Sequence, residues 1–141
     1  MRCVDVNVLV YAHRPESPKH AEWRNWLDAA RSGPERLGLI GAVATGFLRI
    51  VTHPRVFDQP TPIVVALEFV DALRAAPAVA DVGPGPRHWQ LVSELCRATG
   101  ATGNRVPDAA LAAISLEQGA TFVTADHGFA RYEGLRVDIP V

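Results

Sequence analysis

The sequence predicts an α/β fold, a three-layer α/β/α sandwich around a mostly parallel central sheet, formed by one domain over residues 1–141. Two observations lead to this prediction. Short apolar runs typical of buried strands alternate with amphipathic helical patterns from one end of the chain to the other. The length of 141 residues and the 48% hydrophobic content suit one core, and no repeat or low-complexity linker divides the chain.

In the first half of the chain, strand and helix patterns follow one another between proline-containing turns. The opening segment begins as a short strand and turns into a helix near Asn7, which stands where a helix cap is expected. Further on, Trp23, Trp26 and Leu27 recur at helical spacing. The predicted elements of this half are a strand-to-helix segment at 2–12, a helix at 21–31, a strand at 36–41 and a helix within 42–54 that ends at a proline.

The second half continues the alternation, and its helix ends are marked by proline and glycine. Pro77 closes one helix, while Gly100 and Gly119 stand where the next two are expected to stop. The predicted elements are a helix at 63–76, a strand and Gly/Pro turn at 78–86, a helix at 87–100, an Ala-rich helix with Pro107 near its start, a buried strand at 121–125, a short helical turn at 126–132 and an edge strand at 135–141.

Composition narrows the class of protein. The formal net charge of −1 gives no overall attraction to nucleic acid, so any RNA contact must come from local charge placement. Cys3 and Cys96 form no CxxC pair, which excludes a zinc finger and a disulfide scaffold. Cys3 is interpreted as a small core residue in a reducing compartment. No segment approaches the ~20 apolar residues of a membrane span, and Asp5 interrupts the first apolar stretch, so we expect a soluble cytoplasmic protein without a signal peptide.

Three acids stand at predicted junctions between strands and helices. Asp5 ends the first strand, Asp108 opens the Ala-rich helix, and Asp126 follows the buried strand TFVTA. In parallel α/β sheets such junctions gather at the carboxyl ends of the strands. Carboxylate oxygens there suit Mg²⁺ or Mn²⁺, which can activate a water and stabilise charge on a phosphate.

Each acid also has a purely structural interpretation. Asp5 could cap the first helix, and Asp126 could cap the short helical turn. Asp108 could simply occupy the first turn of its helix, where the helix dipole favours a negative charge. One shared site explains all three positions together. Other enzyme classes lack their signatures, because the chain contains no GxGxxG or GxxxxGK[ST] loop and no GxSxG elbow.

Three blocks of sequence resemble PIN-domain ribonucleases, and the VapC branch of bacterial toxins in particular. They are VDVNVLVYA, GFLRIVTHPRVF and GNRVPDAALAAISLEQGATFVTAD followed by GFARYEGLRV, so the resemblance covers nearly the whole chain. It implies a PIN-like fold and a Mg²⁺ or Mn²⁺ site at Asp5, Asp108 and Asp126 that cleaves RNA. It further implies a cognate VapB-type antitoxin and a homodimer.

The resemblance has one departure. Many family members carry a glutamate where this chain has Gly46, so the expected four-acid cluster is reduced to three. We interpret this as a variant metal site, in which a water takes the place of the missing carboxylate or metal affinity is weaker. The alternative function is a PIN-fold binding module that has lost its chemistry at Gly46.

Further residues are candidates for supporting roles. Asn7 and Asn104 are expected to support the acidic cluster, Asn104 by resemblance. Trp23 and Trp26 indicate a core or an interface, and the helices at 21–31 and 63–76 are the expected surfaces for antitoxin docking and self-association. The candidates for contact with RNA phosphates or for proton transfer are Arg49, His53, Arg55 and His127.

Overall fold

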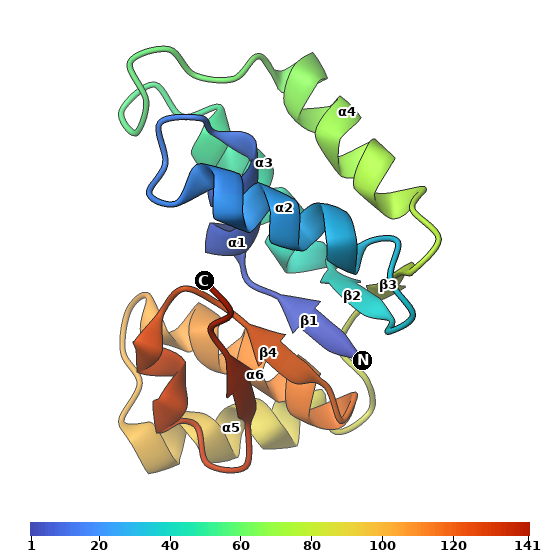
Figure 1. Cartoon of the computed structure of the whole chain (residues 1–141). Helices are drawn as coiled ribbons and strands as arrows, with labels where there is room; N and C mark the ends of the chain where they lie inside the picture. Colours follow the sequence, from blue (N-terminus) through green and yellow to red (C-terminus); the bar gives the residue numbers. More distant parts are fainter.

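A five-stranded sheet forms the middle layer of the computed structural model, which describes all residues 1–141 (Figure 1). The strand order is β3-β2-β1-β4-β5, and every neighbouring pair is parallel. The strands are β1 (Arg2–Val4), β2 (Leu37–Ile40), β3 (Val79–Val82), β4 (Thr121–Val123) and β5 (Arg136–Asp138). The sheet is thus wholly parallel where the sequence predicted a mostly parallel one, and the last strand lies at an edge as predicted.

Helices cover both faces of the sheet, so the predicted three layers are confirmed. One layer holds α1 (Val6–His13), α2 (His20–Ala30), α3 (Gly41–Val51) and α4 (Ile63–Arg74). The other holds α5 (His88–Thr99) and α6 (Arg105–Glu117), which pack against each other in the lower half of Figure 1. The short 3-10 helix η1 (His127–Arg131) connects β4 to β5. None of the helices combines the length and the apolar character that spanning a lipid bilayer requires.

The central strands are apolar because they are buried on both faces. All four residues of β2 are buried, and so are Cys3 and Val4 of β1. Gly38 is required where these two strands pair, because a Cβ there would lie 2.8 Å from the Cys3 Sγ atom. The prediction that Cys3 is a core residue is confirmed, since its exposed fraction is 0%.

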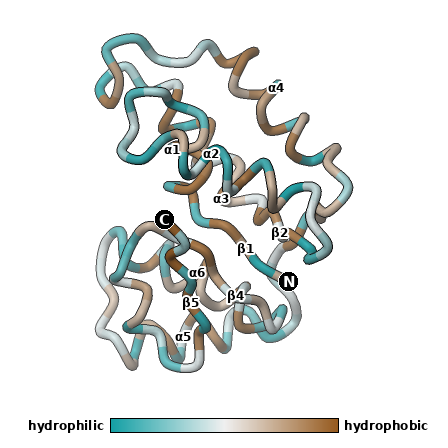
Figure 2. Tube along the Cα trace, in the orientation of Figure 1, coloured by the Kyte–Doolittle hydropathy of each residue, from teal (hydrophilic) through white to brown (hydrophobic).

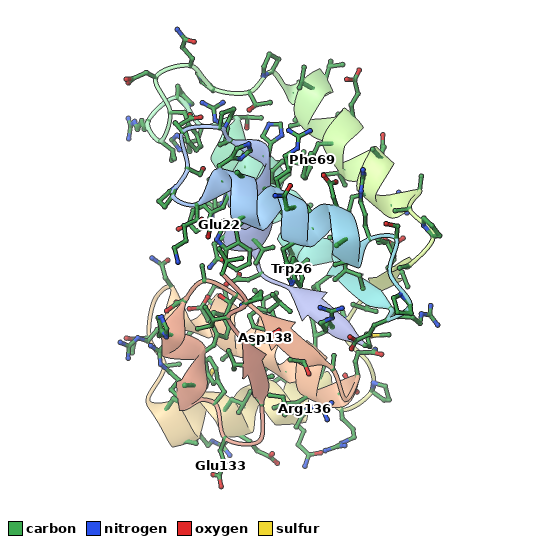
Figure 3. The ribbon with its side chains drawn as sticks, in the orientation of Figure 1. Glu22, Trp26, Phe69, Glu133, Arg136 and Asp138 are labelled. Atoms are coloured by element: carbon green, nitrogen blue, oxygen red, sulfur yellow. The ribbon has the colours of Figure 1, made fainter.

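Aromatic side chains pack against one another in the layer formed by α1, α2, α3 and α4. Trp23 is 2% exposed and meets Trp26 edge to face, so the core interpretation of this pair is confirmed for Trp23. The rings of His13, Phe47 and Phe69 contact one another, and the His13 centroid lies 5.3 Å from that of Phe47 and 4.9 Å from that of Phe69. Figure 3 labels Trp26 on α2 and Phe69 on α4, and the latter attaches α4 to α1 and α3.

Local sequence signals set most element boundaries. Gly100 ends α5 with φ of 65°, as the predicted C-cap glycine requires. The first helix is capped by Asp5 rather than near Asn7, because the Asp5 carboxylate accepts a hydrogen bond from the Val6 N–H. Asp126 caps η1 by accepting from the Gly128 N–H, as the sequence predicted.

The strand order places a topological switch point between β1 and β4. The chain builds the sheet from β1 outward through β2 to β3, then returns through α5 and α6 to the opposite side of β1. The connections on either side of this point diverge, which opens a crevice at the carboxyl ends of the two strands. Asp5 directly follows β1 and Asp126 follows β4, so both stand at this crevice.

Candidate active site

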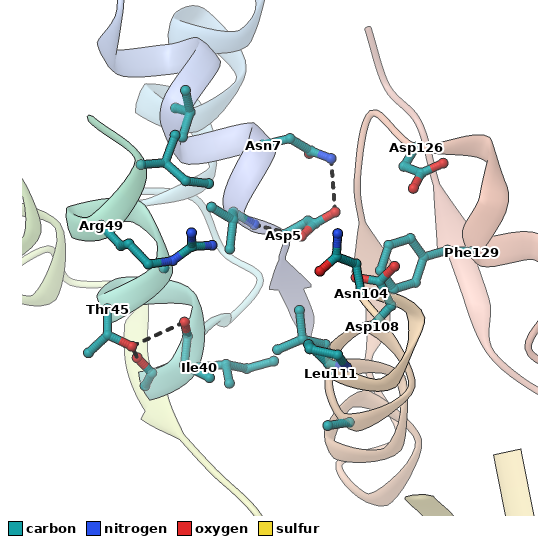
Figure 4. Close-up of a pocket in the computed structure, with 18 of the residues that line it drawn as sticks. Asp5, Asn7, Ile40, Thr45, Arg49, Asn104, Asp108, Leu111, Asp126 and Phe129 are labelled. Carbon is teal, nitrogen blue, oxygen red and sulfur yellow. Dashed lines mark hydrogen bonds between the residues drawn. The ribbon is translucent and has the colours of Figure 1, made fainter. Parts of the chain in front are cut away.

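A cleft of about 1160 Å³ lies along the carboxyl ends of the strands (Figure 4). Its walls come from α1, α3, the loop after β3, the first turns of α6 and the turn after β4. Asp5, Asp108 and Asp126 all line it, although they are separated by up to 121 positions in the sequence. The structure therefore brings the three acids to one place.

Asp5 is held firmly at the end of β1. Its exposed fraction is 7%, and its Oδ1 atom accepts from the Val6 N–H at 2.7 Å. Its Oδ2 atom accepts from the Thr124 hydroxyl at 2.6 Å and from the Asn7 amide nitrogen at 2.9 Å. The carboxylate therefore keeps one fixed orientation and retains a free lone pair on Oδ1.

A buried hydroxyl connects the two central strands across the switch point. Besides donating to Asp5, the Thr124 Oγ1 atom accepts from the Asp126 N–H at 3.0 Å and lies 3.2 Å from the Asn7 amide nitrogen. The Asn7 Oδ1 atom accepts from the Ala125 N–H at 3.1 Å. Asn7 thus supports the cluster as predicted, and it does so by holding the turn after β4 against Asp5.

Thr124 is a site residue that the sequence interpretation did not single out. It follows the apolar run TFV directly and is fully buried. A polar side chain at the end of a buried strand needs a partner. That position beside Asp126 was the signal that would have identified it.

Asp108 and Asp126 face the cleft with oxygens that no protein group satisfies. Asp108 lies in the first turn of α6 and accepts no hydrogen bond, so it is not a helix cap. Asp126 uses only Oδ1, which accepts from the Gly128 N–H at 2.7 Å. The unused oxygens leave coordination capacity on both residues.

The three charges act on one another. Burial raises the pKa of Asp5, and the charges of Asp108 and Asp126 add to this, although the hydrogen bonds it accepts oppose the rise. Burial and the charge of Asp126 raise the pKa of Asp108, while Arg131 and Arg105 oppose that effect. A bound cation would relieve both the burial cost and the repulsion.

The donor set fits a hard divalent cation that keeps part of its water. No group of three or more acidic, histidine or cysteine side chains is close enough to hold an ion. Mg²⁺ is commonly bound through one or two carboxylates while it retains several waters. The free oxygens of Asp108 and Asp126 and the free lone pair of Asp5 suit that kind of binding. The metal-ligand roles of these residues remain a prediction.

The other predicted residues divide into two groups. Asn104 precedes α6 and lines the cleft, and Arg49 of α3 lines the opposite wall without an ion pair (Figure 4). His53, Arg55 and His127 do not line the cleft. The His53 ring is occupied within its own turn, because its Nδ1 atom accepts from the Arg55 N–H at 3.0 Å.

Gly46 lies on α3 at the cleft wall. A Cβ at this position would lie 3.0 Å from a methyl group of Val6, which is tight but adjustable. A side chain placed here would therefore stand beside the start of α1, close to Asp5. The position where the resemblance expects a fourth acid is thus on the cleft, and this chain leaves it without a ligand.

Comparisons with known proteins give the chain clear relatives. The PIN-domain family model matches residues 2–135. VapC ribonuclease Mb2897 of Mycobacterium bovis is 49% identical over 96% of this chain and 92% of that protein. Ribonuclease VapC25 of Mycobacterium tuberculosis is 38% identical over 96% of each.

Solved structures share the fold at low sequence identity. The crystal structure of VapBC2 from Rickettsia felis, bound to a DNA fragment from its promoter, matches with a TM-score of 0.72 and 15% identity. That match covers 97% of this chain and 96% of the other. The Mycobacterium tuberculosis toxin VapC20, described as cleaving the sarcin–ricin loop, matches with a TM-score of 0.67 and 14% identity over 99% of this chain and all of the other.

Proposed function

The chain belongs to the PIN-domain family, and from that premise we propose that it is a ribonuclease that acts as the toxin of a VapBC-type toxin–antitoxin pair. One observation carries the chemistry. Three carboxylates from the ends of β1 and β4 and the start of α6 line one cleft, opposite an unpaired arginine. The ribonuclease names of relatives at 49% and 38% identity support this activity over that of a silent binding module.

We further propose that the enzyme depends on Mg²⁺ or Mn²⁺ bound at Asp108, Asp126 and Asp5, with one or two of these carboxylates as direct ligands and the rest acting through waters that the ion retains. When bound, such an ion lowers the pKa of a coordinated water and neutralises charge on a phosphate oxygen. Asp5 supplies a fixed carboxylate, because its hydrogen bonds leave it a single orientation. Asn7 and Thr124 keep the end of β4 in register with it.

Arg49 and Asn104 are proposed to position the RNA. A guanidinium binds phosphate in a forked geometry, and the Arg49 side chain is directed toward the cleft centre in Figure 4. Asn104 offers an exposed amide beside Asp108. The cleft thus combines negative groups for a cation with a positive group for the RNA backbone, although the net charge of the chain is −1.

The proposed partners are a cognate VapB-type antitoxin and a second copy of this chain. Several structural neighbours are toxin–antitoxin complexes, including VapBC-1 of Haemophilus influenzae and FitAcB of Neisseria gonorrhoeae. The α4 helix exposes Ile63, Val64 and Leu67, with exposed fractions of 52%, 62% and 42%. Figure 2 shows the hydrophobic residues that recur along α4. An apolar helix face of this kind is typical of an interaction surface.

A cleavage assay tests the proposal. The purified protein is incubated with total RNA, with Mg²⁺, with Mn²⁺ or with EDTA, beside the variants Asp5→Asn and Asp108→Asn. We expect cut ends only with a divalent ion and a loss of at least 100-fold in rate in both variants. Cleavage that persists in EDTA would refute the metal dependence, and undiminished cleavage by both variants would refute the site. Absence of cleavage under every ion would favour the binding module.

A further inference from the structure

The cleft continues well beyond the acids, toward the edge of the sheet. This far end is lined by Ile40 and Gly41 at the end of β2, by Val82 and Pro84 at the end of β3, and by His88 at the start of α5. Strand β3 lies three strands away from β4. With neighbouring strands about 4.8 Å apart, the two ends of the cleft are separated by roughly 14 Å.

The far end differs chemically from the acidic end. Leu111 and Ile114 of α6 join Ile40 and Val82 there, and none of the residues that line this part is a lysine, arginine, aspartate or glutamate. Apolar walls without a cation do not hold a phosphate, but they suit the flat face of a nucleobase. The far end is continuous with the acid-lined part of the cleft. A single-stranded RNA whose phosphate lies at the acids is therefore positioned to place a neighbouring base at the far end.

His88 provides a polar group in this apolar surrounding. Its Nδ1 atom is buried and has no hydrogen-bond partner. We assign to the ring the tautomer with its proton on Nε2, in which Nδ1 is an unpartnered acceptor rather than an unpartnered donor. No protein group bonds to Nε2, and this atom is not among the buried unsatisfied ones. The residue therefore offers the cleft one free N–H donor.

The loop between β3 and α5, which forms this end of the cleft, is held in place before any ligand binds. The Glu117 carboxylate, at the end of α6, accepts from the Gly85 N–H at 2.8 Å and from the Arg87 N–H at 2.7 Å. A Cβ on Gly85 would lie 2.6 Å from that carboxylate, so the approach depends on glycine. A wall held in this way can discriminate between ligands because it needs no ordering upon binding.

We propose that the far end of the cleft is a nucleobase subsite, in which His88 selects a base of single-stranded RNA near the cleaved bond through a hydrogen bond from Nε2. The proposal rests on the ribonuclease function and adds to it a residue that determines sequence preference. A base with an acceptor facing His88 would be preferred over one that presents a donor there.

The test is cleavage of a random-sequence RNA pool with Mg²⁺, followed by sequencing of the cut ends. We expect the wild type to show a base preference at a position near the cut, and His88→Leu to reduce that preference about 10-fold, the effect of one lost hydrogen bond. His88→Gln, which keeps an N–H donor, should restore part of it. Gln90→Leu is the matched control, because Gln90 is exposed on the same helix and does not line the cleft.

The outcomes separate this proposal from the one on which it rests. No base preference in the wild type, or a slower His88→Leu with an unchanged preference, would overturn the subsite. Loss of antitoxin binding in His88→Leu with the RNA preference intact would assign the surface to a protein partner and also overturn it. Equal cleavage by Asp108→Asn and the wild type would instead refute the ribonuclease site itself, whatever the base preference.

Discussion

Asp5 combines a structural role and a place in the cleft in one side chain. Its Oδ1 atom caps α1, and its Oδ2 atom ties β1 to the end of β4 through Thr124. Both interpretations that the sequence left open are therefore compatible. These hydrogen bonds fix the carboxylate, which keeps an unused lone pair on Oδ1, and the residue still lines the cleft.

The pH dependence of stability follows from the raised pKa of Asp108. Burial and the charge of Asp126 place the folded-state pKa of Asp108 above its ordinary value of 3.8, so ionisation disfavours the folded state. The contribution of this carboxyl to stability is complete below pH 3.8 and is lost as the pH rises through the raised pKa. In EDTA, Asp108→Asn should therefore match the wild type at low pH and become the more stable protein as the pH approaches 7.

This expectation is checked by urea unfolding between about pH 3 and pH 7. Asp81→Asn serves as a control of opposite sign, because the Arg74 guanidinium lowers the pKa of Asp81 and the variant should lose stability as the pH rises. A difference between wild type and Asp108→Asn that does not change with pH would contradict the account of the cluster.

Gly46 is a position at which a single substitution can add a negative charge to the site. We expect Gly46→Glu to tighten Mg²⁺ binding about 10-fold, the effect of roughly 1.4 kcal/mol of added attraction. Gly46→Gln has the same length and meets Val6 in the same way, so it controls for space and for the loss of helix glycine. Calorimetric titration of both variants measures the difference, and equal affinities would place this position outside the reach of the ion.

At the scale of elements, α6 joins the two ends of the cleft. Asp108 lies in its first turn, and Glu117 at its last residue holds the loop before α5. The apolar residues between them fill the core, since five consecutive residues from Leu111 to Ser115 are buried. One rigid helix therefore sets the distance between the acids and the proposed base subsite.

Removal of the Glu117 carboxylate should loosen that connection. Glu117→Ala loses two charge-assisted hydrogen bonds to the Gly85 and Arg87 N–H groups, and we expect the free energy of unfolding to fall by about 1–2 kcal/mol. Hydrogen exchange should become faster at these two amides while the amides of α4 keep their protection. Unchanged exchange at both would show that the loop is held by other contacts. Glu94→Ala, on the exposed face of α5, is the control.

At the scale of the whole molecule, the topological switch point brings the three carboxylates to one cleft, where together they can attract a cation. The cost of bringing three carboxylates together is met by the fold, so an ion that relieves their repulsion should bind the folded state selectively. At a free Mg²⁺ concentration 100 times its Kd, we expect about 2.7 kcal/mol of stabilisation, or a Tm increase of roughly 5–10 °C.

Thermal unfolding with Mg²⁺, against NaCl at equal ionic strength, measures this effect. Asp108→Asn should lose most of the increase, because it removes a carboxylate that accepts no hydrogen bond from the protein. A Tm that rises equally in NaCl would reduce the effect to general screening of charge.

Most of the elements could be predicted because each carries its own local signal. The apolar run LGLI predicts a buried strand, Gly100 predicts a helix end, and Trp23 predicts an inward helix face. The acids were found for a similar reason, since charges at the ends of apolar runs stand out. His53, Arg55 and His127 were predicted from local charge alone, and the fold does not bring them to the cleft.

The sequence by itself determined the order of strands and helices, the buried faces and the identity of the three acids. Only the tertiary structure decided that Thr124 and Asn7 hold Asp5, and that the cleft extends past the acids to His88. The physical reason is that helix and strand patterns depend on neighbours along the chain. A cleft depends on strand order, and here the return of the chain to the far side of β1 makes residues more than 100 positions apart into neighbours.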